Sequence, residues 1–224
     1  MNLAVRLDAG ASALGLELKG TQRERLLGYV DLLLKWNRTY NLTAVRSAED
    51  VIDLHVLDSL AVLPALRKSA LAGRRDSALP ALADVGSGAG LPGLVIALLE
   101  PGWRITSVEA VAKKAAFQRQ ACIELGIGNV TVTAARVETL PPGGFDLVVS
   151  RAFAELAKFV ALAGHLVTAG GRLLAMKGVL PGAELDRLPA GWRASDILPL
   201  RVPGLDARRH LIVLEKTETC TSSP

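Results

Sequence analysis

The sequence is poor in the residues that carry metal, disulfide and covalent chemistry. Its 224 residues include only two cysteines, Cys122 and Cys220, and three histidines. The cysteines lie far apart and form no Cys-x-x-Cys pair, which excludes the ordinary zinc spacings and gives no disulfide framework. We therefore expect no bound metal and a reducing compartment.

Long hydrophobic runs are also missing. The longest uncharged stretch, residues 85–99, contains several glycines and is shorter than a membrane-spanning helix. The first residues carry charges early and lack the apolar region of a secretory signal. These features predict a soluble cytoplasmic protein that does not associate with a membrane.

Aromatic residues make up only 4% of the chain, so base recognition by stacking has few candidates. A net charge of +4 and an isoelectric point near 9.3 are compatible with a polyanionic partner but do not establish one. The length allows one sizeable core with a small additional segment.

One stretch combines an apolar run, an acid and closely spaced glycines: Asp84-Val85-Gly86-Ser87-Gly88-Ala89-Gly90-Leu91-Pro92-Gly93. This pattern is typical of a buried strand that turns tightly into a helix, where glycines let backbone N–H groups approach a ligand. The spacing of Gly88, Gly90 and Gly93 also fits a dinucleotide fingerprint, so the loop alone does not identify its ligand. A Walker-type nucleotide loop is excluded, because no Gly-Lys-Ser/Thr follows the glycines.

Around that loop, strand-like and helix-like segments alternate. Strands are expected at residues 82–85, 104–109, 130–133, 145–149 and 172–176, with closing strands at 192–200 and 208–214. Helices are expected at 91–99, 111–125 and 156–167. Repeated βαβ units predict an α/β fold with a mostly parallel central sheet and helices on both faces.

Two helices are expected before the sheet. The first is capped by Thr21, a turn-prone segment follows at 37–41, and a capping box at Ser47 opens the second. We expect an N-terminal helical segment, residues 1–75, packing on a ligand-binding core, residues 76–216. Residues 217–224 are expected to form a flexible tail.

The carboxyl ends of the expected strands carry candidate ligand residues. Glu109 ends the second strand about twenty residues after the glycine loop, where a carboxylate can accept both hydroxyl protons of a ribose. Asp84 either holds the loop or faces a ligand amine. Little chain remains for the substrate domain of a nicotinamide dehydrogenase, which favours S-adenosylmethionine, whose methyl group is already activated.

Several motifs in order resemble the bacterial ribosomal RNA small subunit methyltransferase G family, also called glucose-inhibited division protein B. The resemblance covers residues 21–215 and rests on Lys35-Trp36-Asn37-Arg38-Thr39-Tyr40-Asn41-Leu42-Thr43-Ala44-Val45-Arg46, His55-Val56-Leu57-Asp58-Ser59, the glycine loop, Arg136-Val137-Glu138, Ser150-Arg151-Ala152-Phe153-Ala154, Lys177-Gly178 and Leu205-Asp206-Ala207-Arg208-Arg209-His210-Leu211. Ala89 departs from the proline or glycine expected in the loop, but a small residue still fits there.

The resemblance implies a Rossmann-like class I methyltransferase fold. It also implies methylation of a guanine N7 in 16S ribosomal RNA, to give 7-methylguanosine. It places Gly86 and Leu91 on the cofactor, Val137 and Glu138 beside its adenine, and Arg151 at the mouth shared by cofactor and acceptor. With the loop and strand-end residues, the expected cofactor contacts are Asp84, Gly86, Ser87, Gly88, Leu91, Glu109, Val137, Glu138 and Arg151.

Basic residues in these motifs are expected to bind RNA, namely Arg136, Lys177 and Arg209, with Arg151 positioning the acceptor. Ion pairing within the fold is the alternative, and Glu138 is near enough to Arg136 to make it serious. The lysines that open the 111–125 helix are expected on a solvated face. The partner is then 16S ribosomal RNA or the small ribosomal subunit, bound by a monomer.

Three other functions remain open from the residues. A methyltransferase of this fold could act on a small molecule, and a nicotinamide oxidoreductase could use the same loop. A non-catalytic RNA-binding assembly factor could bind the cofactor only for stability. Methyl transfer to RNA separates these functions from the one that the resemblance implies.

Overall fold

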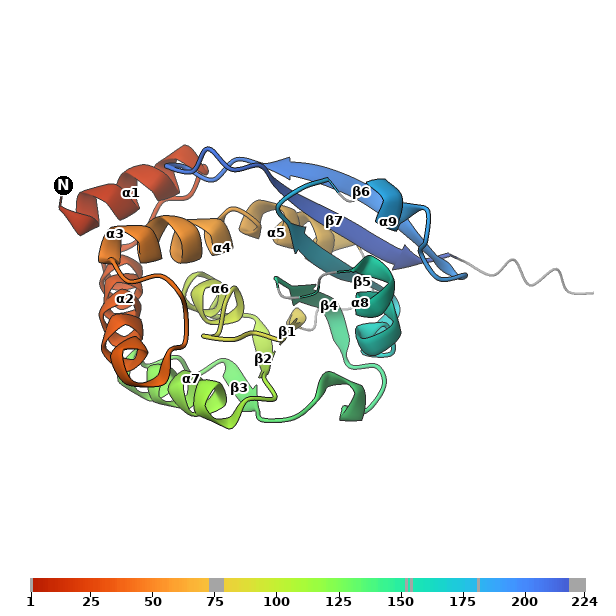
Figure 1. Cartoon of the computed structure of the whole chain (residues 1–224), viewed down its shortest axis with the longest axis horizontal. Coiled ribbons are helices and arrows are strands. Elements are labelled where there is room, and N and C mark those ends of the chain that lie inside the picture. Colours follow the sequence, from red (N-terminus) through yellow and green to blue (C-terminus); the bar gives the residue numbers. More distant parts are fainter. Residues whose placement is uncertain (1, 73–78, 152, 154, 181, 218–224) are drawn as a thin grey trace, which may run out of the picture.

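A computed structural model describes residues 2–72, 79–151, 153, 155–180 and 182–217 (Figure 1). The helices are α1 Leu3–Ala13, α2 Gly20–Tyr40, α3 Ala48–Val51, the π-helix η1 Ile52–Leu57, α4 Asp58–Leu60, α5 Leu63–Ala72, α6 Gly93–Leu99, α7 Ala112–Glu124, the 3₁₀ helix η2 Val137–Thr139, α8 Leu156–Ala163 and α9 Gly182–Leu185. The strands are β1 Ala81–Val85, β2 Arg104–Val108, β3 Val130–Thr133, β4 Phe145–Ser150, β5 Val167–Lys177, β6 Trp192–Leu200 and β7 Arg209–Lys216.

The strands form one sheet in the order β3-β2-β1-β4-β5-β7-β6. Strands β1 to β5 pair in parallel, and β7 runs antiparallel to both β5 and β6. The expected α/β fold with a mostly parallel sheet is thus confirmed. Strands β2 and β3 lie on one side of β1, and β4 and β5 lie on the other, so the strand order reverses between β1 and β4. Ligands of such sheets bind at the carboxyl ends of the strands beside this reversal.

Two hydrophobic clusters cover the two faces of the sheet. The larger cluster joins residues of α1 to α6 and α7 with Leu82 and Leu147 of the sheet. The smaller one joins α8 with Ala83 and Val148, the next residue along each of those strands. Because successive side chains of a strand point to opposite faces, the N-terminal helices and α8 cover opposite sides of the sheet. In Figure 1, α1, α2 and α3 lie at the left and α8 lies at the right.

The N-terminal helices differ from the sequence-based expectation in three ways. Helix α1 was not expected, and α2 begins at Gly20 with Lys19 as its N-cap, so the cap assigned to Thr21 is wrong. The expected turn at 37–41 is also wrong, because α2 continues to Tyr40 and ends in a left-handed residue, Asn41, with φ 50°. Asn37 lies inside the helix, and its buried side chain bonds the following loop instead.

Most other boundaries lie close to expectation, but the helix expected at 156–167 ends at Ala163, and β5 begins at Val167 rather than at residue 172. Ser47 caps the next helix by accepting a hydrogen bond from the Asp50 backbone at 3.0 Å, as the capping-box pattern predicts. The proposed boundary near residue 75 and nearly all of the proposed tail lie outside the described residues. None of the described helices is long and apolar enough to span a membrane.

Candidate functional site

The glycine loop turns the chain sharply from β1 into α6. Gly86, Gly88 and Gly90 have φ angles of 67°, 59° and 82°, in the left-handed region that other residues rarely adopt. The backbone N–H groups of Gly86 and Ser87 donate to the Val108 carbonyl, at 2.9 and 3.3 Å. The loop is therefore tied to the end of β2.

Asp84 holds the other end of the loop. Its side chain is fully buried, and Oδ2 accepts a hydrogen bond from the Gly93 backbone N–H at 2.7 Å, at the start of α6. Burial raises the pKa of this carboxyl to about 7, because the charged form is desolvated. Its Oδ1 has no partner among the described residues. The geometry shows the loop-holding role, and contact with a ligand amine stays a prediction.

Glu109 anchors the middle of the loop. Its two carboxylate oxygens accept backbone hydrogen bonds from Gly88, at 2.8 Å, and from Val111, at 2.7 Å. The side chain of Gln118 supports the same loop by donating to the Ser87 hydroxyl and to the Gly88 carbonyl, both at 2.8 Å. Each oxygen of Glu109 retains accepting capacity, so the expected ribose contact stays a prediction.

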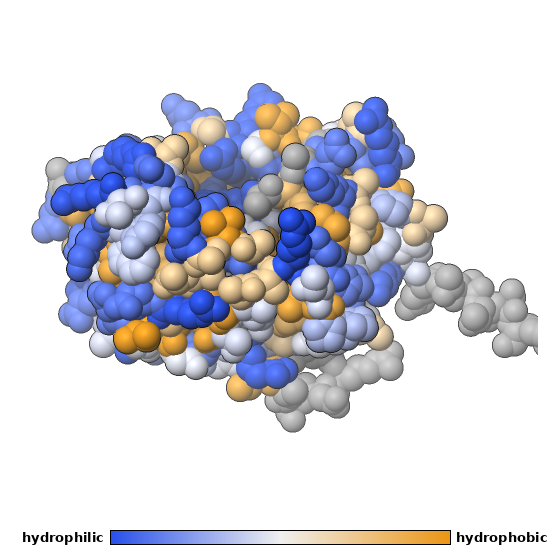
Figure 2. Space-filling model, turned by 60° about the horizontal axis from the view of Figure 1, so that its bottom comes forward, coloured by the Kyte–Doolittle hydropathy of each residue, from blue (hydrophilic) through white to orange (hydrophobic). Residues whose placement is uncertain are grey.

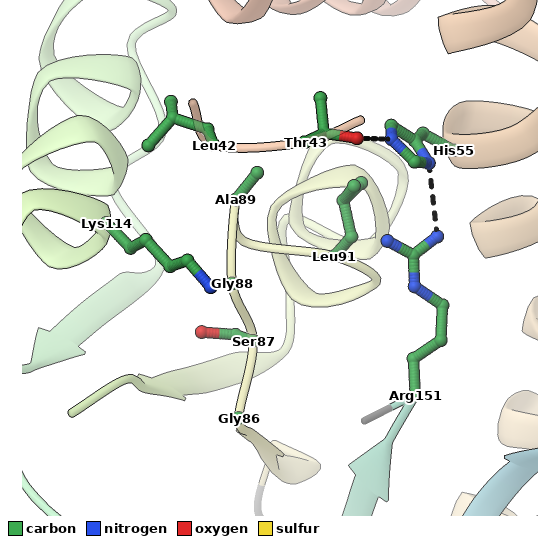
Figure 3. A pocket seen from close by; sticks show the side chains of 10 residues that line it. All are labelled: Leu42, Thr43, His55, Gly86, Ser87, Gly88, Ala89, Leu91, Lys114 and Arg151. Atoms are coloured by element: carbon green, nitrogen blue, oxygen red, sulfur yellow. Dashed lines mark hydrogen bonds between the residues drawn. The ribbon is translucent and has the colours of Figure 1, made fainter. Parts of the chain in front are cut away.

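A pocket of about 220 Å³ opens above this loop (Figure 3). It brings together the predicted residues Gly86, Ser87, Gly88, Leu91 and Arg151. The other residues that line it are Leu42, Thr43, His55, Ala89 and Lys114. The glycine loop and the end of β4 thus meet in one cavity, at the point where the strand order reverses.

Arg151, just after β4, reaches across the cavity toward the N-terminal helices. Its Nη1 lies 3.2 Å from the Leu54 carbonyl, 3.4 Å from Nδ1 of His55 and 3.4 Å from Oδ2 of Asp58. The side chain remains 29% exposed. A guanidinium is thereby fixed beside the loop while part of it stays available to a ligand.

His55 forms the wall between Arg151 and the loop that follows α2. Its Nε2 lies 2.7 Å from the Thr43 hydroxyl, and Nδ1 lies 2.8 Å from the Leu54 carbonyl. Burial and then the charge of Arg151 lower the pKa of His55, which favours the neutral ring. The hydrogen bonds support the structural role expected for this histidine. It sits in the π-helix η1, a local widening of the helix that often occurs at functional sites.

Three lining residues were missed as site residues. Lys114 was expected on a solvated face, which is wrong, because α7 points its side chain toward Gly88 at the pocket (Figure 3). Leu42 and Thr43 were noted only within a motif, although Asn37 holds their loop by bonding Val45 and Thr43. These residues reach the pocket because α2 packs beside the glycine loop, which the sequence pattern does not reveal. The hydroxyl of Tyr29 in α2 donates a hydrogen bond to the Ala89 carbonyl of the loop at 2.8 Å.

The basic residues expected to bind RNA all have acidic neighbours. Arg136 lies 3.7 Å from Glu138 but is 78% exposed. Lys177 is largely buried and 2.9 Å from Glu184, and Arg209 is 3.0 Å from Asp58. The ion-pair alternative is therefore observed for each, and RNA contact stays a prediction. Val137 and Glu138 lie in η2 and are not among the lining residues of the pocket.

Thiol and metal chemistry have few candidates within the described ranges. Cys122 lies in α7, and burial raises the pKa of its thiol to about 11, so it is not a thiolate at neutral pH. Cys220 falls outside the described residues. No three or more His, Cys, Asp or Glu side chains in the described part of the chain are grouped to hold a metal ion.

Comparison with known proteins gives matches over most of the chain. The sequence model of the family described as rRNA small subunit methyltransferase G matches residues 22–212. The ribosomal RNA small subunit methyltransferase G of Burkholderia thailandensis is 52% identical over 221 residues, covering 96% of this chain and 93% of that protein.

Solved structures resemble the fold at low sequence identity. A ribosomal protein L11 methylase from Lactobacillus delbrueckii matches with a TM-score of 0.53 and 14% identity, over 72% of this chain and 77% of that one. A SAM-dependent methyltransferase from Aquifex aeolicus matches with a TM-score of 0.52 and 16% identity, over 74% of this chain and 92% of that one. These likenesses support the class I methyltransferase fold.

Proposed function

The chain belongs to the rRNA small subunit methyltransferase G family, and on this premise we propose that it methylates N7 of a guanine in 16S ribosomal RNA. Enzymes of this family use S-adenosylmethionine as the methyl donor. The observation that carries the proposal is the pocket at the carboxyl ends of β1 and β4, where the glycine loop faces Arg151. Donor and acceptor can meet there without a second domain.

The loop residues fit the cofactor. A Cβ built on Gly88 would meet no atom within 4 Å, so this backbone borders open space in the pocket. S-adenosylmethionine, when bound, supplies a methyl group activated by a positive sulfur. We assign its binding to Gly86, Ser87, Gly88 and Leu91, with Asp84 and Glu109 holding the loop, and its adenine to Val137 and Glu138. The pairing of Glu109 with Gly88 fixes the loop before the cofactor arrives.

Guanine N7 carries a free lone pair, so no general base has to remove a proton before transfer. The protein then acts by holding the acceptor in line with the methyl group and excluding water. This requirement agrees with a pocket in which both ring nitrogens of His55 already have partners, the Thr43 hydroxyl and the Leu54 carbonyl. We propose that no side chain here acts as an essential acid or base.

Arg151 is the residue we assign to orienting the acceptor. A guanidinium is a planar donor that suits guanine O6, beside the reacting N7, or a nearby phosphate. Lys114, for which no acidic partner occurs among the described residues, adds a second cation at the rim. We assign Lys114 to a phosphate of the RNA, together with the exposed Arg136. Lys177 and Arg209 would also contact the RNA, after releasing their ion pairs with Glu184 and Asp58.

On the face shown in Figure 2, hydrophilic side chains cover both sides, and more hydrophobic ones gather across the middle. We propose a monomer that acts in the cytoplasm, where assembling ribosomal subunits are found, without membrane association.

The proposal is tested by transfer of a labelled methyl group from S-adenosylmethionine to 16S ribosomal RNA and to isolated small subunits, followed by mapping of 7-methylguanine. We expect label at one guanine N7. Label on small molecules alone would favour a different acceptor, whereas tight RNA binding without transfer at saturating cofactor would favour an assembly factor. Either result would refute the proposed activity.

A further inference from the structure

One buried carboxylate joins three distant parts of the chain beside the pocket. Asp58, at the start of α4, is only 3% exposed. Its Oδ1 accepts a hydrogen bond from Nε of Arg209 at 3.0 Å, at the start of β7. Its Oδ2 lies 3.4 Å from Nη1 of Arg151, just after β4. The carboxylate therefore lies between two guanidinium groups of the central sheet.

Both arginines remain partly exposed, at 29% for the Arg151 side chain and 26% for that of Arg209, whereas the Asp58 side chain is 4% exposed. The acid is thus hidden and the two cations are presented outward. Two positive charges share the one negative charge of Asp58, and of these three side chains Arg151 lines the pocket. Without the carboxylate, the two guanidinium groups would lose the counter-ion that they share and would repel each other.

We infer that Asp58 is a positioning residue for methyl transfer, which acts by holding Arg151 at the pocket. This inference rests on the proposed function. Among the described residues, the other hydrogen-bond partners of Arg151 are the Leu54 carbonyl and His55, whose neutral form is favoured, so Asp58 supplies the charged contact that fixes its direction. Misplacement of an orienting group by about 1 Å can lower turnover by about 100-fold.

A second buried aspartate nearby provides a matched control. Asp53 is 6% exposed, lies in η1 five positions before Asp58, and pairs with Arg6 of α1. Neither Asp53 nor Arg6 lines the pocket. Replacing either aspartate by asparagine removes one buried carboxylate that forms an ion pair with arginine. Only the change at Asp58 affects a partner of Arg151.

The test is a double-mutant cycle on methyl transfer to small subunits, with Asp58→Asn, Arg151→Ala and the combination. If Asp58 acts through Arg151, Asp58→Asn lowers kcat by about 10- to 100-fold in the wild-type background. In the Arg151→Ala background it lowers kcat by less than about twofold, because the group it positions is already gone. Asp53→Asn leaves kcat within about twofold of the wild type, even if it lowers the melting temperature equally.

The outcomes separate this inference from the proposed function. An inactive wild-type enzyme would refute the function itself. An active wild type with unchanged kcat in folded Asp58→Asn, or an equal loss in both backgrounds, would overturn the positioning role alone. If Asp58 acted only through its negative charge, Asp58→Asn would bind RNA more tightly and retain kcat. This result would also overturn the positioning role.

If Asp58→Asn does not fold, Asp58→Glu decides the question. This variant keeps the negative charge but moves the carboxylate by one methylene group, so Arg151 loses its position without losing its counter-ion. A reduced kcat with little change in cofactor affinity supports the inference, and wild-type turnover in Asp58→Glu would overturn it.

Discussion

The contact between Gly93 and Asp84 gives a sharp prediction for Gly93→Ala. A Cβ at position 93 would lie 2.8 Å from Oδ2 and 3.0 Å from Cβ of Asp84, which is fully buried and cannot move into solvent. The same Oδ2 accepts the 2.7 Å hydrogen bond from the Gly93 backbone. The added methyl group must therefore displace either the carboxyl or the start of α6.

Two costs and one gain set the size of the change in stability. Overpacking a filled interior costs about 1–3 kcal/mol, and a weakened buried hydrogen bond costs about 1–3 kcal/mol more. Helix propensity alone favours alanine over glycine by about 1 kcal/mol. We expect a net loss of about 1–5 kcal/mol, which lowers the melting temperature by about 2–4 °C per kcal/mol in a chain of this size.

Thermal and urea unfolding measure the loss, and calorimetric titration with S-adenosylmethionine measures its effect on the loop. Gly102→Ala is the control, because a Cβ at position 102 meets no atom within 4 Å. We expect its stability to be unchanged or slightly raised. In an Asp84→Ala background the 2.8 Å contact with Oδ2 is removed and only the 3.0 Å contact with Cβ remains, so Gly93→Ala should cost less there. A stability of Gly93→Ala equal to or above that of the wild type would refute the steric argument.

Three further predictions concern charged groups of the site. Because the folded-state pKa of Asp84 is raised from 3.8 to about 7, its contribution to stability is present below pH 3.8 and is lost as pH rises through 7. The melting temperature of the wild type relative to Asp84→Asn should therefore fall over this range, and a constant difference would contradict the burial effect. Lys114→Ala should raise KM for the small subunit by about threefold to tenfold and reduce the salt dependence of binding. The control, Lys113→Ala, removes an exposed neighbouring charge and should have a smaller effect on both quantities. Equal effects of the two variants would show that Lys114 is not part of the site. Arg151→Ala should keep its circular dichroism spectrum and lose methyl transfer by about tenfold or more, and wild-type activity would exclude an orienting role.

Local sequence signals predicted much of the fold. The strands β1 to β4, the helix after the glycine loop and the cap at Ser47 lie within a few residues of their expected positions. These elements depend on hydrophobic periodicity and on short-range capping, which a single segment contains. Helix α1 and the full length of α2 were not predicted, because packing against other helices, such as η1 for α1 and α6 for α2, stabilises them beyond their local propensity.

The sequence by itself determined the glycine loop, the acids Asp84 and Glu109 that flank it, and the motif that contains Arg151. Glycines at positive φ and acids at strand ends are local requirements, so spacing along the chain exposes them. Only the tertiary structure decided that Asp58 holds both Arg151 and Arg209, and that Lys114 faces the pocket. These pairings join side chains from separate elements, and their partners depend on how the elements pack, which no local pattern contains.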